Sequence, residues 1–298
     1  MHPIRKETIV NIYYFPMNIK RKPEWLKIDF RSDKQYSIVS KSLKNNCLHT
    51  ICVSGRCPNM AECWGRGTAT FMILGDICTR SCRFCNTKTG RPLPPMESEA
   101  EKLANSVREL KLKHVVITSV DRDDLPDGGA THWARCISRL KSEVPEATVE
   151  VLIPDFRGDT NLVDIVLDAK PDIVAHNIET VERMTPSVRS AARYDLSLNV
   201  LKHIADRGFR AKSGIMLGVG EEDSEVLQTM DDLLEVGCQV LTIGQYLQPT
   251  KQHLEVSRYV TPEQFAEFKG IGLKKGFNFV ESGPLVRSSY HAEEQVIK

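Results

Sequence analysis

Three cysteines lie close together in the sequence at a spacing that suits metal binding. Cys78, Cys82 and Cys85 follow the pattern CxxxCxxC directly after a short β-rich run. Three thiolates at this spacing converge on one site only if the chain curls around it, so we expect a loop here. A structural zinc site has four protein ligands, and neither a histidine nor a fourth cysteine lies close by. This downstream trio favours a [4Fe–4S] cluster with one iron open to a ligand; zinc with a distant fourth ligand is the alternative.

A second group of cysteines precedes the first. Cys52, Cys57 and Cys63 are spaced CxxxxCxxxxxC, which is wider than zinc ribbons use. Beside the downstream trio, this upstream trio is predicted to hold a second cluster. Cys47 leaves an alternative open, because with the upstream trio it provides the four thiolates of an all-cysteine cluster. Seven of the nine cysteines fall between Cys47 and Cys85, which indicates thiols kept reduced for metal binding.

The overall composition limits the other classes of function. The chain of 298 residues has 40 Lys plus Arg and 39 Asp plus Glu, so its formal net charge is +1. This balance gives no reason to expect a nucleic acid as the main partner. No stretch approaches the ~18 uninterrupted apolar residues of a membrane helix, and the first residues do not resemble a secretory signal. We therefore expect a globular cytoplasmic protein without membrane association.

Alternating strand and helix patterns indicate which elements position the cysteines. Apolar residues at helical spacing separate the β-rich runs, and parallel strands need such helical crossovers. The pattern predicts an α/β fold, either a full or partial barrel or an open doubly wound sheet. In both, chemistry is done at the carboxyl ends of the strands. The runs cover residues 71–74, 114–119, 148–153, 172–178, 209–217 and 240–245, with a short final strand at 277–280 and an irregular arm at 1–40.

The downstream trio, at the end of the first run, resembles the site of the radical S-adenosylmethionine superfamily. Together the two trios resemble the lipoyl synthase family. Two alternatives to a lipoyl synthase remain. One is biotin synthase, another radical enzyme that inserts sulfur, but it lacks the upstream trio. The other, from another class of function, is a structural zinc or iron–sulfur module without catalysis. Further blocks similar to lipoyl synthases occur in the same order from about residue 20 to the C-terminus, at residues 57–59, 62–64, 75–80, 120–125, 176–180, 244–250 and 283–290.

The resemblance implies a role for each metal ligand. The downstream trio would hold the cluster that cleaves S-adenosylmethionine. The upstream trio would hold an auxiliary [4Fe–4S] cluster, which in this family is the source of sulfur. Its fourth ligand would be a serine of the block 287–290, and we place it at Ser289, with Ser288 as the near alternative.

Four further residues are candidates for contacts with S-adenosylmethionine. Asn177 and Glu179 lie at a strand end, where polar side chains are costly unless they bind something, so a ligand contact is favoured over a capping role. Lys212, within an apolar strand, pairs either with a carboxylate of the cofactor or with a neighbouring Asp or Glu. Gly218 follows the same strand, where it either lets the backbone approach the cofactor or forms a tight turn.

The resemblance also implies an architecture and an activity. The fold would be a partial (β/α)6 TIM-like barrel (71–281), with an N-terminal arm and cysteine-rich loop (1–70) and a C-terminal tail (282–298) capping one mouth. The activity would be that of a sulfurtransferase, which inserts two sulfur atoms into an octanoyl chain. That chain would be carried on a lysine of a lipoyl domain of a 2-oxoacid dehydrogenase E2 subunit or of the glycine-cleavage H protein. Ferredoxin or flavodoxin would supply electrons, an iron–sulfur carrier protein would be a further partner, and the basic residues 20–27 could contact an acidic carrier.

Overall fold

The computed structural model describes residues 21–27, 34–66 and 68–295, and its main sheet has eight strands. They are ordered β1-β2-β5-β6-β7-β8-β9-β10. Each neighbouring pair from β2 to β10 is parallel, whereas β1 is antiparallel to β2. The strands of the main sheet are β1 (His49–Thr50), β2 (Thr70–Ile73), β5 (His114–Ser119), β6 (Thr148–Leu152), β7 (Ile173–Ala175), β8 (Arg210–Leu217), β9 (Val240–Gln245) and β10 (Phe279–Gly283). A second, small sheet pairs β3 (Ile77–Cys78) with β4 (Lys88–Thr89).

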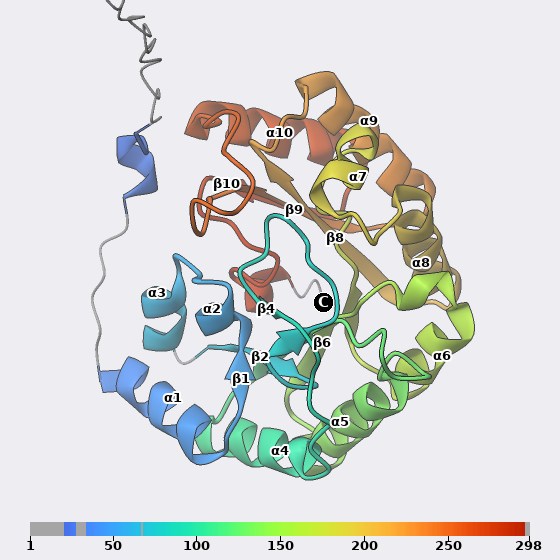
Figure 1. Ribbon diagram of the computed structural model, residues 1–298. Helices are drawn as coiled ribbons and strands as arrows, with labels where there is room; N and C mark the ends of the chain where they lie inside the picture. Colours follow the sequence, from blue (N-terminus) through green and yellow to red (C-terminus); the bar gives the residue numbers. More distant parts are fainter. Residues whose placement is uncertain (1–20, 28–33, 67, 296–298) are drawn as a thin grey trace, which may run out of the picture.

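Helices surround the outer face of this sheet (Figure 1). Because consecutive strands are neighbours and the helices lie on one side, the sheet curves as a partial barrel; in a doubly wound sheet the strand order reverses. The expected partial barrel is confirmed, with β10 as an additional parallel strand. No helix of the described ranges has the length and apolar composition needed to cross a bilayer. The helices are α4 (Glu99–Leu110), α5 (Ala130–Glu143), α6 (Thr160–Asp168), α7 (Thr185–Val188), α8 (Tyr194–Asp206), α9 (Asp223–Glu235) and α10 (Pro262–Lys275).

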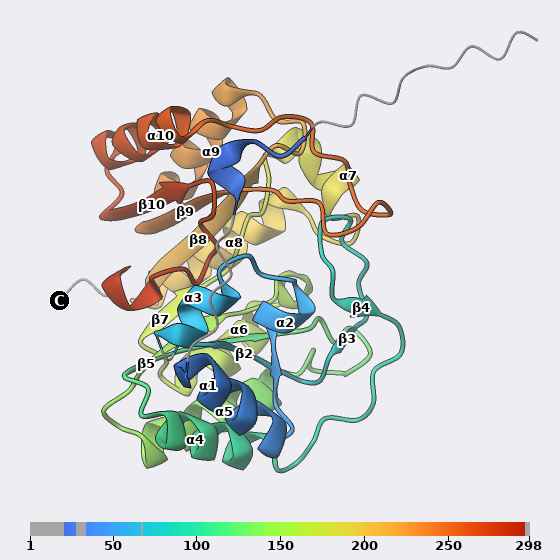
Figure 2. The ribbon, with the colours of Figure 1, turned by 90° about the vertical axis from the view of Figure 1, so that its left-hand side faces the viewer.

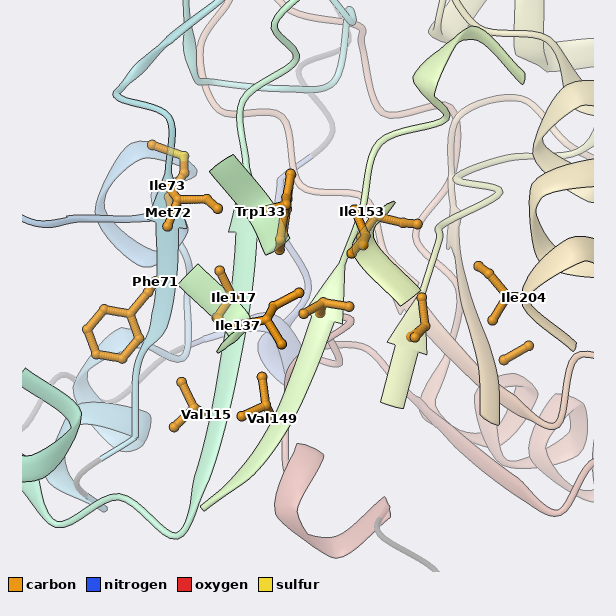
Figure 3. Close-up of a cluster of buried hydrophobic side chains, with 14 of the residues drawn as sticks. Phe71, Met72, Ile73, Val115, Ile117, Trp133, Ile137, Val149, Ile153 and Ile204 are labelled. Atoms are coloured by element: carbon orange, nitrogen blue, oxygen red, sulfur yellow. The ribbon is translucent and has the colours of Figure 1, made fainter. Parts of the chain in front are cut away.

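The hydrophobic core lies between the strands and these helices (Figure 3). Phe71, Val115 and Ile117 project from β2 and β5, and Trp133 and Ile137 project from α5; all five are fully buried. Burying a side chain of this size contributes about 1.5–3 kcal/mol relative to leaving it exposed. The β-branched strand residues therefore fix the barrel wall that carries the site.

The N-terminal part folds differently from the expected irregular arm. Helix α1 (Lys34–Asn45) begins inside residues 1–40, and α2 (Ile51–Ser54) and α3 (Met60–Gly65) follow β1. The expectation of an irregular segment up to residue 40 is wrong for this part, while residues 1–20 and 28–33 lie outside the described ranges. The helical pattern of apolar residues in α1 is weak, because Val39 and Leu43 are the only buried hydrophobic residues of this helix. Helices of 4 and 6 residues, such as α2 and α3, are too short to show a period.

The C-terminal segment after β10 returns to the cysteine-bearing loop at the other end of the chain. Figure 2 shows this segment beside α3. The Asn59 side-chain amide donates to the Leu285 carbonyl at 2.7 Å. Arg66, just after α3, donates to Glu293 at 2.6 Å in the short helix η4 (Ala292–Gln295). Parts of the chain that are 226 residues apart are thus joined at one place.

Candidate functional site

A cavity of about 540 Å³ lies at the carboxyl ends of the parallel strands. Ser119 ends β5 and Gln245 ends β9, and both line it. The whole downstream trio lines the cavity, as do two members of the upstream trio, Cys52 and Cys57. Asn177 and Glu179 line it as well. The structure therefore places most of the predicted site residues around one internal space, at the end of the barrel where such folds carry their chemistry.

The downstream trio lies in the loop that contains β3 and β4. The Cys78 sulfur accepts hydrogen bonds from the backbone N–H groups of Arg80 at 3.4 Å and Asp121 at 3.3 Å. Burial raises the pKa of Cys78 to about 11 and that of Cys82 to about 12. These thiols therefore keep their protons at neutral pH until a metal displaces them.

Arg80 fixes this loop to the ends of two strands. This role of Arg80 was not identified from the sequence. Its guanidinium donates to Asp155 from Nη1 and Nη2, each at 2.8 Å, and to Asp123 from Nε at 2.7 Å. Only 7% of the Arg80 side chain and 2% of Asp155 are exposed, so this is a buried bidentate pair. Burial raises the pKa of Asp155, but the hydrogen bonds and charge of Arg80 outweigh it and bring that pKa to about 2. The clamp holds the cysteine loop in register with β5 and β6.

Asn177 and Glu179 contribute polar atoms to the cavity, and one of these atoms is unsatisfied. Asn177 donates from Nδ2 to Glu179 at 3.0 Å, but its Oδ1 is buried without a hydrogen-bond partner among the described residues. Burial raises the pKa of the Glu179 carboxyl, and the positive charge of Arg189 opposes this shift. Gly214 on β8 leaves this corner open, since a Cβ there would lie 2.9 Å from Asn177 Oδ1. An unpaired acceptor beside an open wall suits a ligand with donor groups, such as an amine.

The upstream trio meets the C-terminal segment in a smaller cavity that adjoins the first. Its lining includes all three upstream cysteines and Ser289, whereas Ser288 lines only the larger cavity. Thr70 donates to the Ser289 hydroxyl at 2.7 Å. Cys47 is exposed and is not among the lining residues of either cavity. The arrangement groups three thiols with one serine hydroxyl.

Cys52 of this group is buried, and Cys57 and Cys63 are partly buried. Burial raises the pKa of Cys52 to about 11 and that of Cys63 to about 12. Across the described ranges, no three His, Cys, Asp or Glu side chains are placed to hold one metal ion. In a [4Fe–4S] cluster each cysteine ligates a different iron, so its ligands do not meet at a single point.

Comparison with known proteins identifies the family. The model of the Radical SAM superfamily matches residues 72–233. Lipoyl synthase of Bacteroides thetaiotaomicron is 62% identical over 276 residues, which are 93% of this chain and 98% of that protein. The chain belongs to the lipoyl synthase family. Lipoyl synthase of Treponema denticola is 58% identical over 278 residues, covering 93% of this chain and 96% of that relative.

Solved structures agree with this lipoyl synthase fold at the level of architecture. Methylornithine synthase has a TM-score of 0.50 and 12% identity, over 84% of this chain and 79% of that one. A maturase of the [FeFe]-hydrogenase has a TM-score of 0.55 and 10% identity, over 74% and 60%. At such low identity the likeness concerns the fold alone. The predicted family is confirmed by the sequence relatives, and biotin synthase and a non-catalytic module are set aside.

Lys212 and Gly218 are not among the residues that line the cavity of this lipoyl synthase family member. The Lys212 ammonium donates to Glu150 at 2.6 Å, and both side chains are almost fully buried in the barrel. This is the second of the two partners expected for Lys212, and we do not retain the residue as a cofactor contact. The Gly218 N–H donates to Glu221 at 2.8 Å at a φ of +95°, which is the tight turn.

Replacement of Lys212 by methionine is expected to destabilise the fold by about 3–5 kcal/mol, because the Glu150 carboxylate stays buried without its cation. Burial raises the pKa of Glu150, and Lys212 together with His114 outweighs this and keeps it ionised. The double variant Lys212→Met/Glu150→Leu should recover most of the loss in urea unfolding of the metal-free protein. It should also bind S-adenosylmethionine like the parent once reconstituted. A folded double variant with weakened S-adenosylmethionine binding would instead make Lys212 a cofactor ligand.

The Arg80–Asp155 pair predicts a pH dependence of stability. The pKa of Asp155 falls from 3.8 to about 2 in the folded chain, so its ionised form contributes about 2 kcal/mol above pH 3.8. This contribution is lost as the pH falls through about 2. The gap in unfolding free energy between the parent and Asp155→Asn should therefore be constant near pH 6 and shrink below pH 4. A gap that stays unchanged down to pH 2.5 would contradict the assignment.

Proposed function

We propose that the chain inserts two sulfur atoms into an octanoyl group carried on a lysine of a lipoyl-domain protein. The observation that carries the proposal is the opening of both cysteine trios onto adjoining cavities of one barrel. Family membership gives the reaction class, and the site supplies the ligands that the reaction requires. The preferred carrier would be an E2 lipoyl domain or the glycine-cleavage H protein.

The residues fit the two [4Fe–4S] clusters and the S-adenosylmethionine that the family implies. The downstream trio offers three thiols, and the orphaned Asn177 Oδ1 offers an acceptor in the same cavity. The upstream trio offers three thiols and the Ser289 hydroxyl. When bound, the first cluster supplies the electron that cleaves S-adenosylmethionine for attack on an unactivated C–H bond, and the second supplies sulfide.

The protein itself positions the substrate and excludes water. Apolar side chains at the ends of two strands line the cavity between the polar groups: Leu152 and Ile153 at the end of β6, and Met216 near the end of β8. They suit an octanoyl tail, which gains free energy by leaving water. A carbon-centred reaction needs its target held at contact distance and shielded from solvent, and a walled cavity provides both.

We also propose a three-part division of the chain into residues 1–70, 71–281 and 282–298. The described contacts of Asn59 with Leu285 and of Arg66 with Glu293 support it, because they join the first and last parts across the barrel. In this division the tail carries Ser289 to the upstream trio and closes that side of the site. The middle part carries the downstream trio.

The remaining partners follow from the chemistry. A ferredoxin or flavodoxin would reduce the clusters, and an iron–sulfur carrier protein would rebuild the auxiliary cluster once its sulfur is consumed. Lys22 is exposed and lines the cavity, so it is available to an acidic carrier; Lys20 of the same basic segment lies outside the described residues. All nine cysteines are free, which suits the reducing cytoplasm.

The proposal is tested by anaerobic reconstitution followed by incubation with an octanoylated lipoyl-domain peptide, S-adenosylmethionine and a reductant. We expect ~8 irons per chain, from two four-iron clusters. Mass spectrometry should show the peptide gaining two sulfur atoms, with release of 5′-deoxyadenosine. Release of 5′-deoxyadenosine without a sulfur-containing peptide, or uptake of zinc without a visible chromophore, would overturn the proposal.

A further inference from the structure

A guanidinium group without a carboxylate partner lies where the two cavities adjoin. Arg287 lines both of them, together with Cys52, Cys57 and Ser289. Its hydrogen bond to protein runs from Nη1 to the carbonyl of Val286, at 2.6 Å. In the part of the chain that the structure describes, Arg287 forms no ion pair with an Asp or Glu.

The fold holds this side chain in place. Gly244 on β9 pairs with Gly283 on β10, and the chain then turns back over β9. A Cβ at Gly244 would lie 2.1 Å from the Val286 carbonyl oxygen and 3.5 Å from Arg287 Nη1, so only glycine admits this approach. On the other side, the Leu285 carbonyl is held by Asn59 of the cysteine loop. The position of the guanidinium is therefore built into the structure.

Arg287 is half-buried, and a cation shielded from water is costly unless an anion faces it. Of the three buried arginines among the described residues, Arg80 and Arg122 meet carboxylates, whereas Arg189 donates to backbone carbonyls and to Ser197. The groups that line the cavities beside Arg287 are instead Cys52 and Cys57 of the upstream trio and Ser289. Metal binding turns the same thiols into thiolates and adds inorganic sulfide. The negative charge that Arg287 lacks in the protein alone thus arrives with a cluster.

We propose that Arg287 is a positioning residue of the auxiliary site, which neutralises the thiolate and sulfide charge of the cluster held by the upstream trio. The inference rests on the proposed function, since it requires that cluster. A cation at this place stabilises the reduced cluster relative to the oxidised one and slows the loss of iron. It also lies on the side where the auxiliary site opens onto the large cavity.

The test isolates the auxiliary cluster in the full-length chain. In the background Cys78→Ala/Cys82→Ala/Cys85→Ala, only the upstream trio remains to bind a cluster. Two substitutions are added to this background. Arg287→Met removes the positive charge of the side chain, and Arg287→Lys keeps it. Arg193→Met is the matched control, because Arg193 is exposed and pairs with Asp195. The midpoint potential and the rate of iron transfer to a chelator are measured on each reconstituted protein, with circular dichroism to verify folding.

We expect Arg287→Met to have a more negative midpoint potential and to release iron about tenfold faster, as for loss of one partner of a partly buried charge pair. Arg287→Lys should remain near the background protein, and Arg193→Met should equal it. Equal potentials and release rates in the background protein and Arg287→Met would overturn the inference. If Arg287→Met fails to fold, a potential of Arg287→Lys that differs from the background would overturn it, and an equal one would support it. A background protein that takes up no iron would overturn the auxiliary cluster itself, a distinct failure of the proposed function.

Discussion

Replacement of Cys52 by alanine is expected to abolish sulfur insertion while cleavage of S-adenosylmethionine continues. Cys52 lines the auxiliary cavity with Cys57, Cys63 and Ser289, whereas the downstream trio occupies a separate loop fixed by Arg80. Removing a ligand should exceed the 10–100-fold cost of losing an outer partner of a metal, so we expect product to fall by more than about a hundredfold. Liquid chromatography with mass spectrometry quantifies 5′-deoxyadenosine and the sulfur-containing peptide in the same reaction.

Two matched variants sharpen this experiment. Cys82→Ala should lose both 5′-deoxyadenosine and product, because it removes a ligand of the downstream trio. Cys47→Ala should keep both, because Cys47 is exposed and lines neither cavity. Sulfur insertion retained in Cys52→Ala would refute the assignment of the upstream trio as the sulfur site. Loss of product in Cys47→Ala would favour the all-cysteine cluster over the one with serine.

The strands could be predicted because their residue types indicate directly that they are buried. The runs at 114–119 and 240–245 agree with β5 and β9 to the residue, since strands covered on both faces are rich in apolar and β-branched residues. The cysteine trios could be recognised for a related reason: their ligands are close in sequence. Spacing carries information only when the chain between two residues is short.

The parts that could not be predicted depend on residues far apart in the sequence. Arg80 meets Asp155 across 75 residues, and nothing local distinguishes that arginine from a surface one. Lys212 was an ambiguous candidate because its partner, Glu150, lies 62 residues away on another strand. Helix α1 was missed because its stripe of buried apolar side chains is narrow. In each case, tertiary contacts decide what the local sequence leaves open.

Alanine substitutions at two adjacent serines should separate the two candidates for the fourth ligand of the auxiliary cluster. Ser289 lines the small cavity with the upstream trio and accepts a hydrogen bond from Thr70, whereas Ser288 faces only the large cavity. We expect Ser289→Ala to lower product formation at least about tenfold and to lose roughly one iron per chain, because one iron of the cubane then lacks a protein ligand. Ser288→Ala should keep the parent iron content and most of the activity.

The measurements are the iron content after gel filtration, the electron paramagnetic resonance spectrum of the reduced auxiliary cluster, and the yield of sulfur-containing peptide. The pair of variants is well matched, since both remove one hydroxyl from the same segment and only the cavity that each hydroxyl faces differs. The spectrum should change in Ser289→Ala and stay unchanged in Ser288→Ala. The reverse pattern would move the ligand to Ser288. Parent-like spectra and yields in both variants would remove serine from the cluster and return the fourth position to a thiolate or to solvent.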